Sequence, residues 1–383
     1  MIYYGRQDID KDDVEAVREV LESDFLTQGP AIERFEKTVA SYCGAKYAVA
    51  VCNATAALHI ACRAAGLQQG DVLWTTPNTF VASANCGLYC GADVDFVDID
   101  EQTYNMSVQE LEKKLASSAK KPKVLVPVHF SGQPCDMEPI RRLAKEYGVT
   151  IIEDASHAIG AEYKGRCIGS CEYSDMTVFS FHPVKIITTG EGGMVLTNNL
   201  DLYEKLKLYR THGITREPNL MSRNDGPWYY EQIDLGYNYR VTDMQAALGC
   251  SQMKRLPEFL QRRRYLANRY SELLADLPLT LPYQKADTNS AWHLYVVRLR
   301  ENRTLSQKNR LFQEMKGQGI ALNMHYIPVH LQPYYQKMGF KRGDFPVSEA
   351  YYDEAFTLPL YYRLTDEDQV KVADALRLSL SKI

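Results

Sequence analysis

Short apolar runs alternate with longer stretches of helical periodicity over the first 200 residues of the sequence. Such runs, bounded by Gly, Pro, Asp or Asn, fit strands that are buried on both faces of a sheet. The strand candidates are Tyr47–Cys52, Asp71–Thr75, Asp93–Val97, Lys123–Val128, Thr150–Glu153, Met176–Ser180 and Gly193–Thr197. The helix candidates are Asp12–Glu22, Pro30–Cys43, Ala54–Ala65, Val81–Leu88, Ser107–Ala116 and Met137–Tyr147. This alternation predicts an α/β fold with a largely parallel sheet and right-handed crossovers.

The pattern changes near residue 250. The later elements expected are a long charged helix, a β-like stretch and two more helices, at Ser251–Leu274, Ala291–Leu299, Ser306–Gln318 and Asp366–Ser381. They predict a smaller α+β domain over 251–383, after a large domain over 1–250. Because Pro and Gly do not gather into a flexible linker, we expect the two domains to pack together.

Composition excludes several classes of protein. With 45% hydrophobic and 24% charged residues in 383, the chain is typical of a globular enzyme and not of a disordered protein. A formal net charge of -4 provides no basic field for nucleic acid or an anionic membrane. The first residues, MIYYGRQDIDKDDV, do not resemble a secretory signal, and no apolar run approaches the ~20 residues that span a bilayer. We therefore expect a cytoplasmic protein.

The nine cysteines are odd in number, and most lie in apolar runs, which predicts buried reduced thiols. Cys86–Cys90 and Cys167–Cys171 share one spacing. Neither pair has the companion Cys/His pair that a zinc site needs. No metal site is expected.

Two residues at neighbouring strand ends point to cofactor chemistry. Asp154 ends the strand in VTIIED, and Lys185 lies between an apolar strand and a glycine-rich return. Alone, Asp154 is more readily explained as a helix cap and Lys185 as a surface residue. Together they match pyridoxal phosphate (PLP), since a desolvated lysine binds an aldehyde and a carboxylate keeps the ring nitrogen protonated.

Two further elements suit the rest of that cofactor. The helix that opens at NATAA provides free backbone N–H groups for a phosphate, and Thr55 adds a hydroxyl. Phe80 lies at a strand–helix junction where its ring can stack on a flat ligand. A capped helix without a ligand and ordinary core packing are the alternatives for these two features.

The motifs resemble those of the DegT/DnrJ/EryC/StrS family of sugar-nucleotide aminotransferases. In order they are LTQGPAIERFE, NATAALHIA, PNTFVASAN, VDIDEQTYN, PVHFSGQPCDM, EDASHAIGAEYKG, FSFHPVKIITTGEGG, GYNYRVTDMQAALG and HYIPVH, which span nearly the whole chain. The resemblance implies the type I (aspartate aminotransferase-like) PLP-dependent transferase fold, with a mostly parallel seven-stranded sheet in the large domain. It also implies homodimers with active sites at the subunit interface.

The resemblance assigns cofactor roles residue by residue. Lys185 matches the lysine that binds the cofactor and moves the proton, and Asp154 matches the partner of the pyridine nitrogen. Phe80 matches the stacking aromatic ring. His157 stands beside the phenolic oxygen, where many relatives have glutamine, and histidine also donates a hydrogen bond there. The phosphate ligands it implies are Thr55, the backbone at Ala56, Ser180, and Asn238 from the other subunit.

Substrate residues follow from the resemblance as well. The candidates are Thr27, Gln28 and Gly29 in LTQGP, together with His325, Tyr326 and His330. Arg240 is a candidate to bind the glutamate carboxylate or the diphosphate, and a structural ion pair at the dimer seam is its alternative. Some relatives carry histidine in place of the catalytic lysine and resemble dehydratases. Lys185 therefore favours transamination and argues against a non-catalytic regulator.

Within the family, EDASHA, SFHPVK, NDGPWYYEQ and HFSGQPCDM are most similar to the aminotransferases of pseudaminic acid biosynthesis. This implies amination at C4 of a UDP-linked 4-keto-6-deoxy-N-acetylhexosamine by L-glutamate, with pyridoxamine phosphate as the other cofactor form. The product is a UDP-4-amino-4,6-dideoxy sugar. The alternative is the same reaction on another keto sugar: GDP-4-keto-6-deoxymannose, a dTDP-3-keto sugar or a UDP-4-ketopentose.

Overall fold

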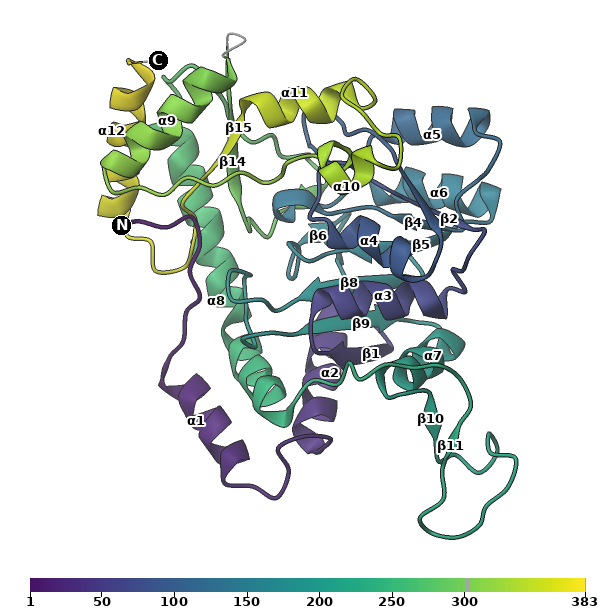
Figure 1. Ribbon diagram of the computed structural model, residues 1–383. Coiled ribbons are helices and arrows are strands. Elements are labelled where there is room, and N and C mark those ends of the chain that lie inside the picture. Colours follow the sequence, from purple (N-terminus) through teal and green to yellow (C-terminus); the bar gives the residue numbers. More distant parts are fainter. Residues whose placement is uncertain (301–303, 383) are drawn as a thin grey trace.

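A computed structural model describes residues 1–300 and 304–382, and a seven-stranded sheet lies at its centre (Figure 1). The strand order is β1 (Tyr47–Val51), β9 (Gly193–Thr197), β8 (Met176–Ser180), β5 (Thr150–Asp154), β4 (Val124–Val126), β2 (Val72–Thr75) and β3 (Asp93–Phe96). Neighbouring strands are parallel except at β9, which is antiparallel to both β1 and β8. The predicted α/β class and mostly parallel seven-stranded sheet are confirmed.

Helices cover both faces of this sheet because the strand side chains alternate between two apolar cores. In β1, Ala48 and Ala50 pack into one core, while Val49 and Val51 pack into the other. The first core is closed by α2 (Pro30–Cys43), α5 (Val108–Ser117), α6 (Met137–Tyr147) and α8 (Asp243–Leu273). The second is closed by α3 (Ala54–Ala64), α4 (Ala82–Tyr89) and α7 (Leu200–Arg210).

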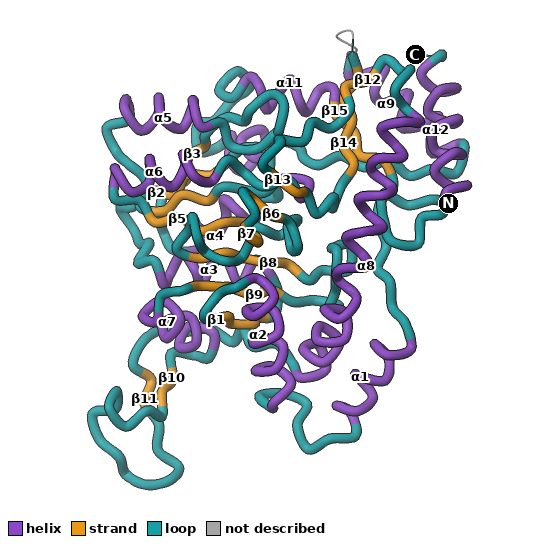
Figure 2. The backbone as a smooth tube through the Cα atoms, turned by 180° about the vertical axis from the view of Figure 1, so that it is seen from behind, coloured by secondary structure: helices purple, strands orange, loops and turns teal. Residues whose placement is uncertain are grey.

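The long helix α8 connects the sheet region to the C-terminal elements. It packs against α1 (Lys11–Leu21) and α2 at one end and α12 (Asp366–Leu380) at the other (Figures 1 and 2). It begins earlier than expected because Thr242 forms a capping box with Gln245. The division of the chain near residue 250 stays a prediction, and that residue lies within this continuous helix.

The C-terminal elements form a smaller α+β layer with an apolar core of its own. A three-stranded antiparallel sheet holds β12 (Leu279–Thr280), β14 (Tyr295–Leu299) and β15 (Ala355–Leu358). It packs with α12 and α9 (Leu305–Gly317). The remaining elements are β6 (Glu162–Tyr163), β7 (Arg166–Cys167), β10 (Ile214–Thr215), β11 (Glu231–Gln232), β13 (Thr288–Asn289), α10 (Pro333–Gln336), α11 (Pro346–Glu354) and the 3₁₀ helices Phe130–Gly132 and Val329–Leu331.

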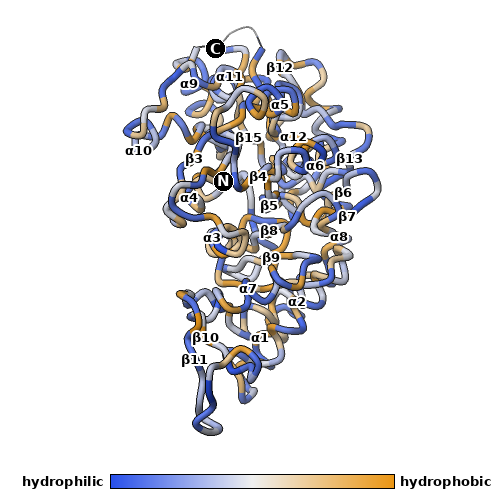
Figure 3. The backbone as a smooth tube through the Cα atoms, turned by 90° about the vertical axis from the view of Figure 1, so that its right-hand side faces the viewer, coloured by the Kyte–Doolittle hydropathy of each residue, from blue (hydrophilic) through white to orange (hydrophobic). Residues whose placement is uncertain are grey.

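The hairpin of β10 and β11, which the sequence pattern did not indicate, projects away from the rest of the molecule (Figure 3). Trp228 and Tyr230 in this hairpin are exposed. Among the described residues, no helix combines the length and the apolar character needed to cross a bilayer.

Candidate active site

A cavity of about 550 Å³ opens at the carboxyl ends of β5 and β8, where parallel sheets place their ligands. The N-terminus of α3, the segment before α4 and the chain near residues 323–326 complete its walls. The cavity brings together eight of the residues predicted from sequence: Thr55, Phe80, Asp154, His157, Ser180, Lys185, His325 and Tyr326.

Lys185 lies in the loop that follows β8, and its side chain lines the cavity. Desolvation lowers the pKa of its amine to about 8, although the nearby negative charge of Asp154 opposes this shift. At pH 7 about one amine in ten is therefore uncharged, against fewer than about one in a thousand for an exposed lysine. The uncharged form is the one that attacks a carbonyl group.

Asp154, at the end of β5, is only 5% exposed, and donors hold both of its carboxylate oxygens. Ser83 Oγ donates to Oδ2 at 2.6 Å, and the backbone N–H and Oγ of Ser156 donate to Oδ1 at 3.1 and 2.6 Å. Ser83 is in turn 2.7 Å from Thr79 Oγ1. These hydroxyls, absent from the sequence-based site, fix the direction of the carboxylate at the cavity wall.

The N-terminus of α3 forms the expected anion site, with one correction. The Asn53 side chain caps the helix by accepting from the Ala56 N–H at 2.8 Å, so this backbone group is already bonded and Ala56 does not line the cavity. Thr55 does line it, as does Ser180 at the end of β8. The helix lies directly on β9, because a Cβ at Gly193 would come within 2.5 Å of the Asn53 carbonyl.

Aromatic and imidazole rings form the opposite wall. His157 Nε2 is 3.1 Å from the Tyr326 hydroxyl, and the His293 ring centroid is 4.4 Å from that of His157. Burial lowers the pKa of all three histidines of this wall, that of His325 to about 3, so they are uncharged at neutral pH. The sequence pattern gave no signal for His293, which enters from the segment before β14.

These groups fit pyridoxal phosphate on structural grounds. The cavity offers an amine with a lowered pKa for the aldehyde, and a carboxylate at the same sheet edge for the ring nitrogen. Phe80, at 58% exposure, presents an open ring face, and the α3 N-terminus suits a phosphate.

Other predicted residues lie apart from this cavity. Gln28, Gly29 and Arg240 line a separate groove of about 240 Å³. Thr27 pairs with Thr242 beside that groove, and the exposed Asn238 pairs with Thr211. These five predicted residues lie near one another on the surface, away from the cavity that contains Lys185 of the same chain.

His330 also lies outside the cavity, and this position does not fit the substrate role predicted for it. It is fully buried, and its Nε2 is 2.9 Å from Glu349 Oε1. Glu349 in turn accepts from the Gly343 N–H. These contacts stabilise the segment between α10 and α11.

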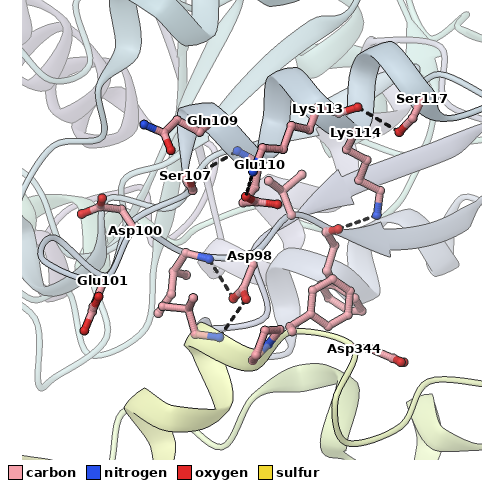
Figure 4. Close-up of a pocket in the computed structure, with 16 residues that line it drawn as sticks. Asp98, Asp100, Glu101, Ser107, Gln109, Glu110, Lys113, Lys114, Ser117 and Asp344 are labelled. Atoms are coloured by element: carbon pink, nitrogen blue, oxygen red, sulfur yellow. Dashed lines mark hydrogen bonds and ion pairs between the residues drawn. The ribbon is translucent and has the colours of Figure 1, made fainter.

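Another cavity, of about 640 Å³, lies between α5 and the start of α11 (Figure 4). Two of its charged side chains are engaged in structural contacts. Asp98 accepts from the Val347 N–H at 2.9 Å, and Lys114 lies 2.6 Å from Asp95. Because the cavity at Lys185 contains the predicted catalytic and cofactor residues, it is the candidate active site.

Known proteins resemble the whole chain. It is 41% identical over 372 residues to the spore coat polysaccharide biosynthesis protein SpsC of Bacillus subtilis, covering 96% of this chain and 94% of the relative. It is 36% identical over 386 residues to a UDP-4-amino-4,6-dideoxy-N-acetyl-beta-L-altrosamine transaminase of Campylobacter jejuni, covering 100% and 98%.

Solved structures of aminotransferases also match the fold over nearly the whole chain. Helicobacter pylori PseC, an aminotransferase involved in the biosynthesis of pseudoaminic acid, superposes with a TM-score of 0.92 at 31% identity over 100% of both chains. A putative sugar aminotransferase from Streptococcus pneumoniae, solved in a PLP-form, gives 0.91 at 29% identity over 99% and 98%.

The sequence profile of the DegT/DnrJ/EryC1/StrS aminotransferase family matches residues 7–377. The chain is thus a PLP-dependent sugar aminotransferase, and the amine, carboxylate and anion site of its cavity agree with that cofactor. The chain belongs to the DegT/DnrJ/EryC1/StrS aminotransferase family.

Proposed function

We propose that this enzyme transfers the amino group of L-glutamate to C4 of a UDP-linked 4-keto-6-deoxy-N-acetylhexosamine. The products are 2-oxoglutarate and a UDP-4-amino-4,6-dideoxy sugar. The observation that carries transamination is Lys185 beside Asp154 in one cavity. The sugar is supported by the likeness to the Campylobacter jejuni transaminase and to PseC.

The residues of the cavity divide the work. When bound, PLP supplies an aldehyde that accepts the amino group and a ring that accepts electron density. Lys185 Nζ would take the proton from the α-carbon of glutamate and return it to the cofactor within the same half-reaction. With the keto sugar the two transfers would run in reverse, so that the conjugate acid of Lys185 delivers the proton to C4 of the sugar. Asp154 stabilises positive charge at the ring nitrogen. Thr55 and Ser180 bind the phosphate.

We further propose that two protomers complete each active site. Asn238 and Arg240 lie with the 27–29 segment on a surface away from their own cavity. In a homodimer this surface would face the cavity of the partner subunit. Asn238 would then reach the cofactor phosphate, and Arg240 would bind a carboxylate or diphosphate bidentately.

The substrate is tested by measuring the four candidate sugars separately. The loaded enzyme is given L-glutamate and one nucleotide sugar at a time: the UDP-4-keto-6-deoxy-N-acetylhexosamine, GDP-4-keto-6-deoxymannose, a dTDP-3-keto sugar or a UDP-4-ketopentose. Amino sugar formation is followed by mass spectrometry. We expect the first substrate to give the highest kcat/KM, by at least about tenfold. A higher kcat/KM for another sugar would reassign the substrate. The alternatives need this test because the chain is also 41% identical to SpsC, whose name specifies no sugar substrate.

A Lys185→Ala variant tests the chemistry independently of the sugar. It should still bind PLP through the phosphate and ring contacts but produce no amino sugar. Turnover near the wild-type rate would remove Lys185 from the mechanism.

A further inference from the structure

The hydrogen bonds of His157 determine which of its nitrogens carries the proton. The Ser131 backbone N–H donates to Nδ1 at 3.2 Å, so Nδ1 acts as an acceptor. Since burial keeps the imidazole uncharged, its single proton resides on Nε2. Nε2 lies 3.1 Å from the Tyr326 hydroxyl oxygen and therefore donates to it.

The Ser131 donor is itself held firmly in place. Its carbonyl accepts from the Leu294 N–H at 3.2 Å, and its hydroxyl donates to the Leu294 carbonyl at 2.7 Å. The next residue, Gly132, has φ +99°, and a Cβ there would meet the His157 carbonyl oxygen at 3.0 Å. The His293 ring packs against that of His157, with their planes tilted by 43°. The orientation of His157 is thus fixed by the fold.

One donor of this wall remains available. Tyr326 Oη accepts a hydrogen bond from His157. Within residues 1–300 and 304–382, the proton of the Tyr326 hydroxyl is not donated to any acceptor. Burial raises the pKa of Tyr326, so the phenol stays protonated. Its ring lines the cavity, with a centroid 6.3 Å from that of Phe80. The hydroxyl is therefore an oriented donor close to the ring on which the cofactor is proposed to stack.

We propose that the Tyr326 hydroxyl, oriented by His157, is the hydrogen-bond donor that this wall presents to an oxygen atom of the bound ligand. His157 acts as a positioning residue, because its proton is already committed to Tyr326. The acceptor is an oxygen of the cofactor or of the keto sugar. This inference rests on the proposed transamination, whose two half-reactions separate the two sources.

The test uses full-length Tyr326→Phe in three measurements: titration of the cofactor-free protein with PLP, the rate with L-glutamate, and the rate of the resulting form with the keto sugar. A three- to tenfold weaker PLP affinity, about the value of one neutral hydrogen bond, would identify a cofactor oxygen. A loss of similar size confined to the sugar half-reaction would identify a sugar oxygen. Wild-type values in all three measurements would overturn the proposal.

Further variants separate orientation from structure. His157→Gln, which can both accept from Ser131 and donate to Tyr326, should keep near wild-type behaviour, while His157→Leu should reproduce the Tyr326→Phe defect. A His157→Leu protein without that defect would overturn the orienting role. Tyr270→Phe is the matched control, since it removes the hydroxyl of a buried tyrosine outside the cavity, which donates to the Pro359 carbonyl at 3.0 Å. If wild type performs neither half-reaction, the proposed function fails, and the PLP titration alone decides this inference.

Discussion

The amine of Lys185 must be uncharged to attack an aldehyde, and its surroundings favour that form. Its pKa of about 8 contrasts with the ~10.4 of an exposed lysine. The rate at which cofactor-free enzyme takes up PLP should therefore rise with pH and reach half its maximum near pH 8. The absorbance of the lysine-bound cofactor reports this rate.

The carboxylate of Asp154 sets the direction in which the midpoint of this uptake curve should move in a second measurement. Its negative charge raises the pKa of Lys185, so Asp154→Asn should move the midpoint of the uptake curve to lower pH. A wild-type midpoint above pH 10, or a shift to higher pH in the variant, would contradict this account of the amine.

Ser83 connects α4 to the carboxylate of β5. Its 2.6 Å bond to Asp154 is buried, so Ser83→Ala leaves a carboxylate oxygen and the Thr79 hydroxyl short of a partner. We expect the free energy of unfolding in urea to fall by about 1–3 kcal/mol. Ser117→Ala, at an exposed hydroxyl of α5, should change it by less than about 0.5 kcal/mol. Equal effects of the two substitutions would show that the Ser83 bond is not stabilising.

Residue roles were predictable from sequence where a residue type is rare in its setting. A lysine and an aspartate at apolar strand ends are such residues, and both line the cavity. Ser83, Ser156 and His293 are not, because a hydroxyl or imidazole gains its role only from the partner that the fold places beside it. The same reason explains why the position of His330 does not fit the substrate role predicted for it. Its partner Glu349, which the fold places beside it, binds it in the interior.

At the scale of elements, the junction of α3 with β9 forms the anion site. Gly193 permits the close contact, since any larger residue would collide with the Asn53 backbone. Gly193→Ala should destabilise the protein by about 1–3 kcal/mol through overpacking. It should also weaken PLP binding in the same titration by displacing the helix end.

Gly317→Ala is the matched control for this substitution. It lies at the end of α9 with open space around the position of a Cβ, so it should be neutral or stabilise by up to about 1 kcal/mol. PLP affinity and stability at wild-type levels in Gly193→Ala would refute the role given to this junction.

Element types followed from local pattern, whereas directions and some ends did not. All seven predicted strands lie in the large sheet, because strands buried on both faces have a recognisable composition. The antiparallel direction of β9 was missed, since it follows from a connection to β8 that contains no crossover helix. The early start of α8 depends on the capping box at Thr242, and α7 was not expected.

At the scale of the whole molecule, the proposed dimer predicts complementation between two impaired variants, which would not occur if each active site were built from a single chain. Lys185→Ala and Asn238→Ala proteins, each impaired alone, should regain activity when they are dissociated and reassociated together. Half of the dimers would be hybrids, each with one intact site, which gives about a quarter of wild-type activity. If Asn238 served the Lys185 of its own chain, no site would be intact and no activity would return. Co-purification of two differently tagged chains verifies that hybrids form.

The central claim is that this cavity performs transamination, and the cofactor spectrum with L-glutamate tests it most directly. The account predicts that L-glutamate abolishes the absorbance band of the lysine-bound cofactor. It also predicts one 2-oxoglutarate formed for each active site, and return of the band when the keto sugar is added. A band that persists, with no 2-oxoglutarate, would contradict L-glutamate as the donor and the reaction assigned to Lys185.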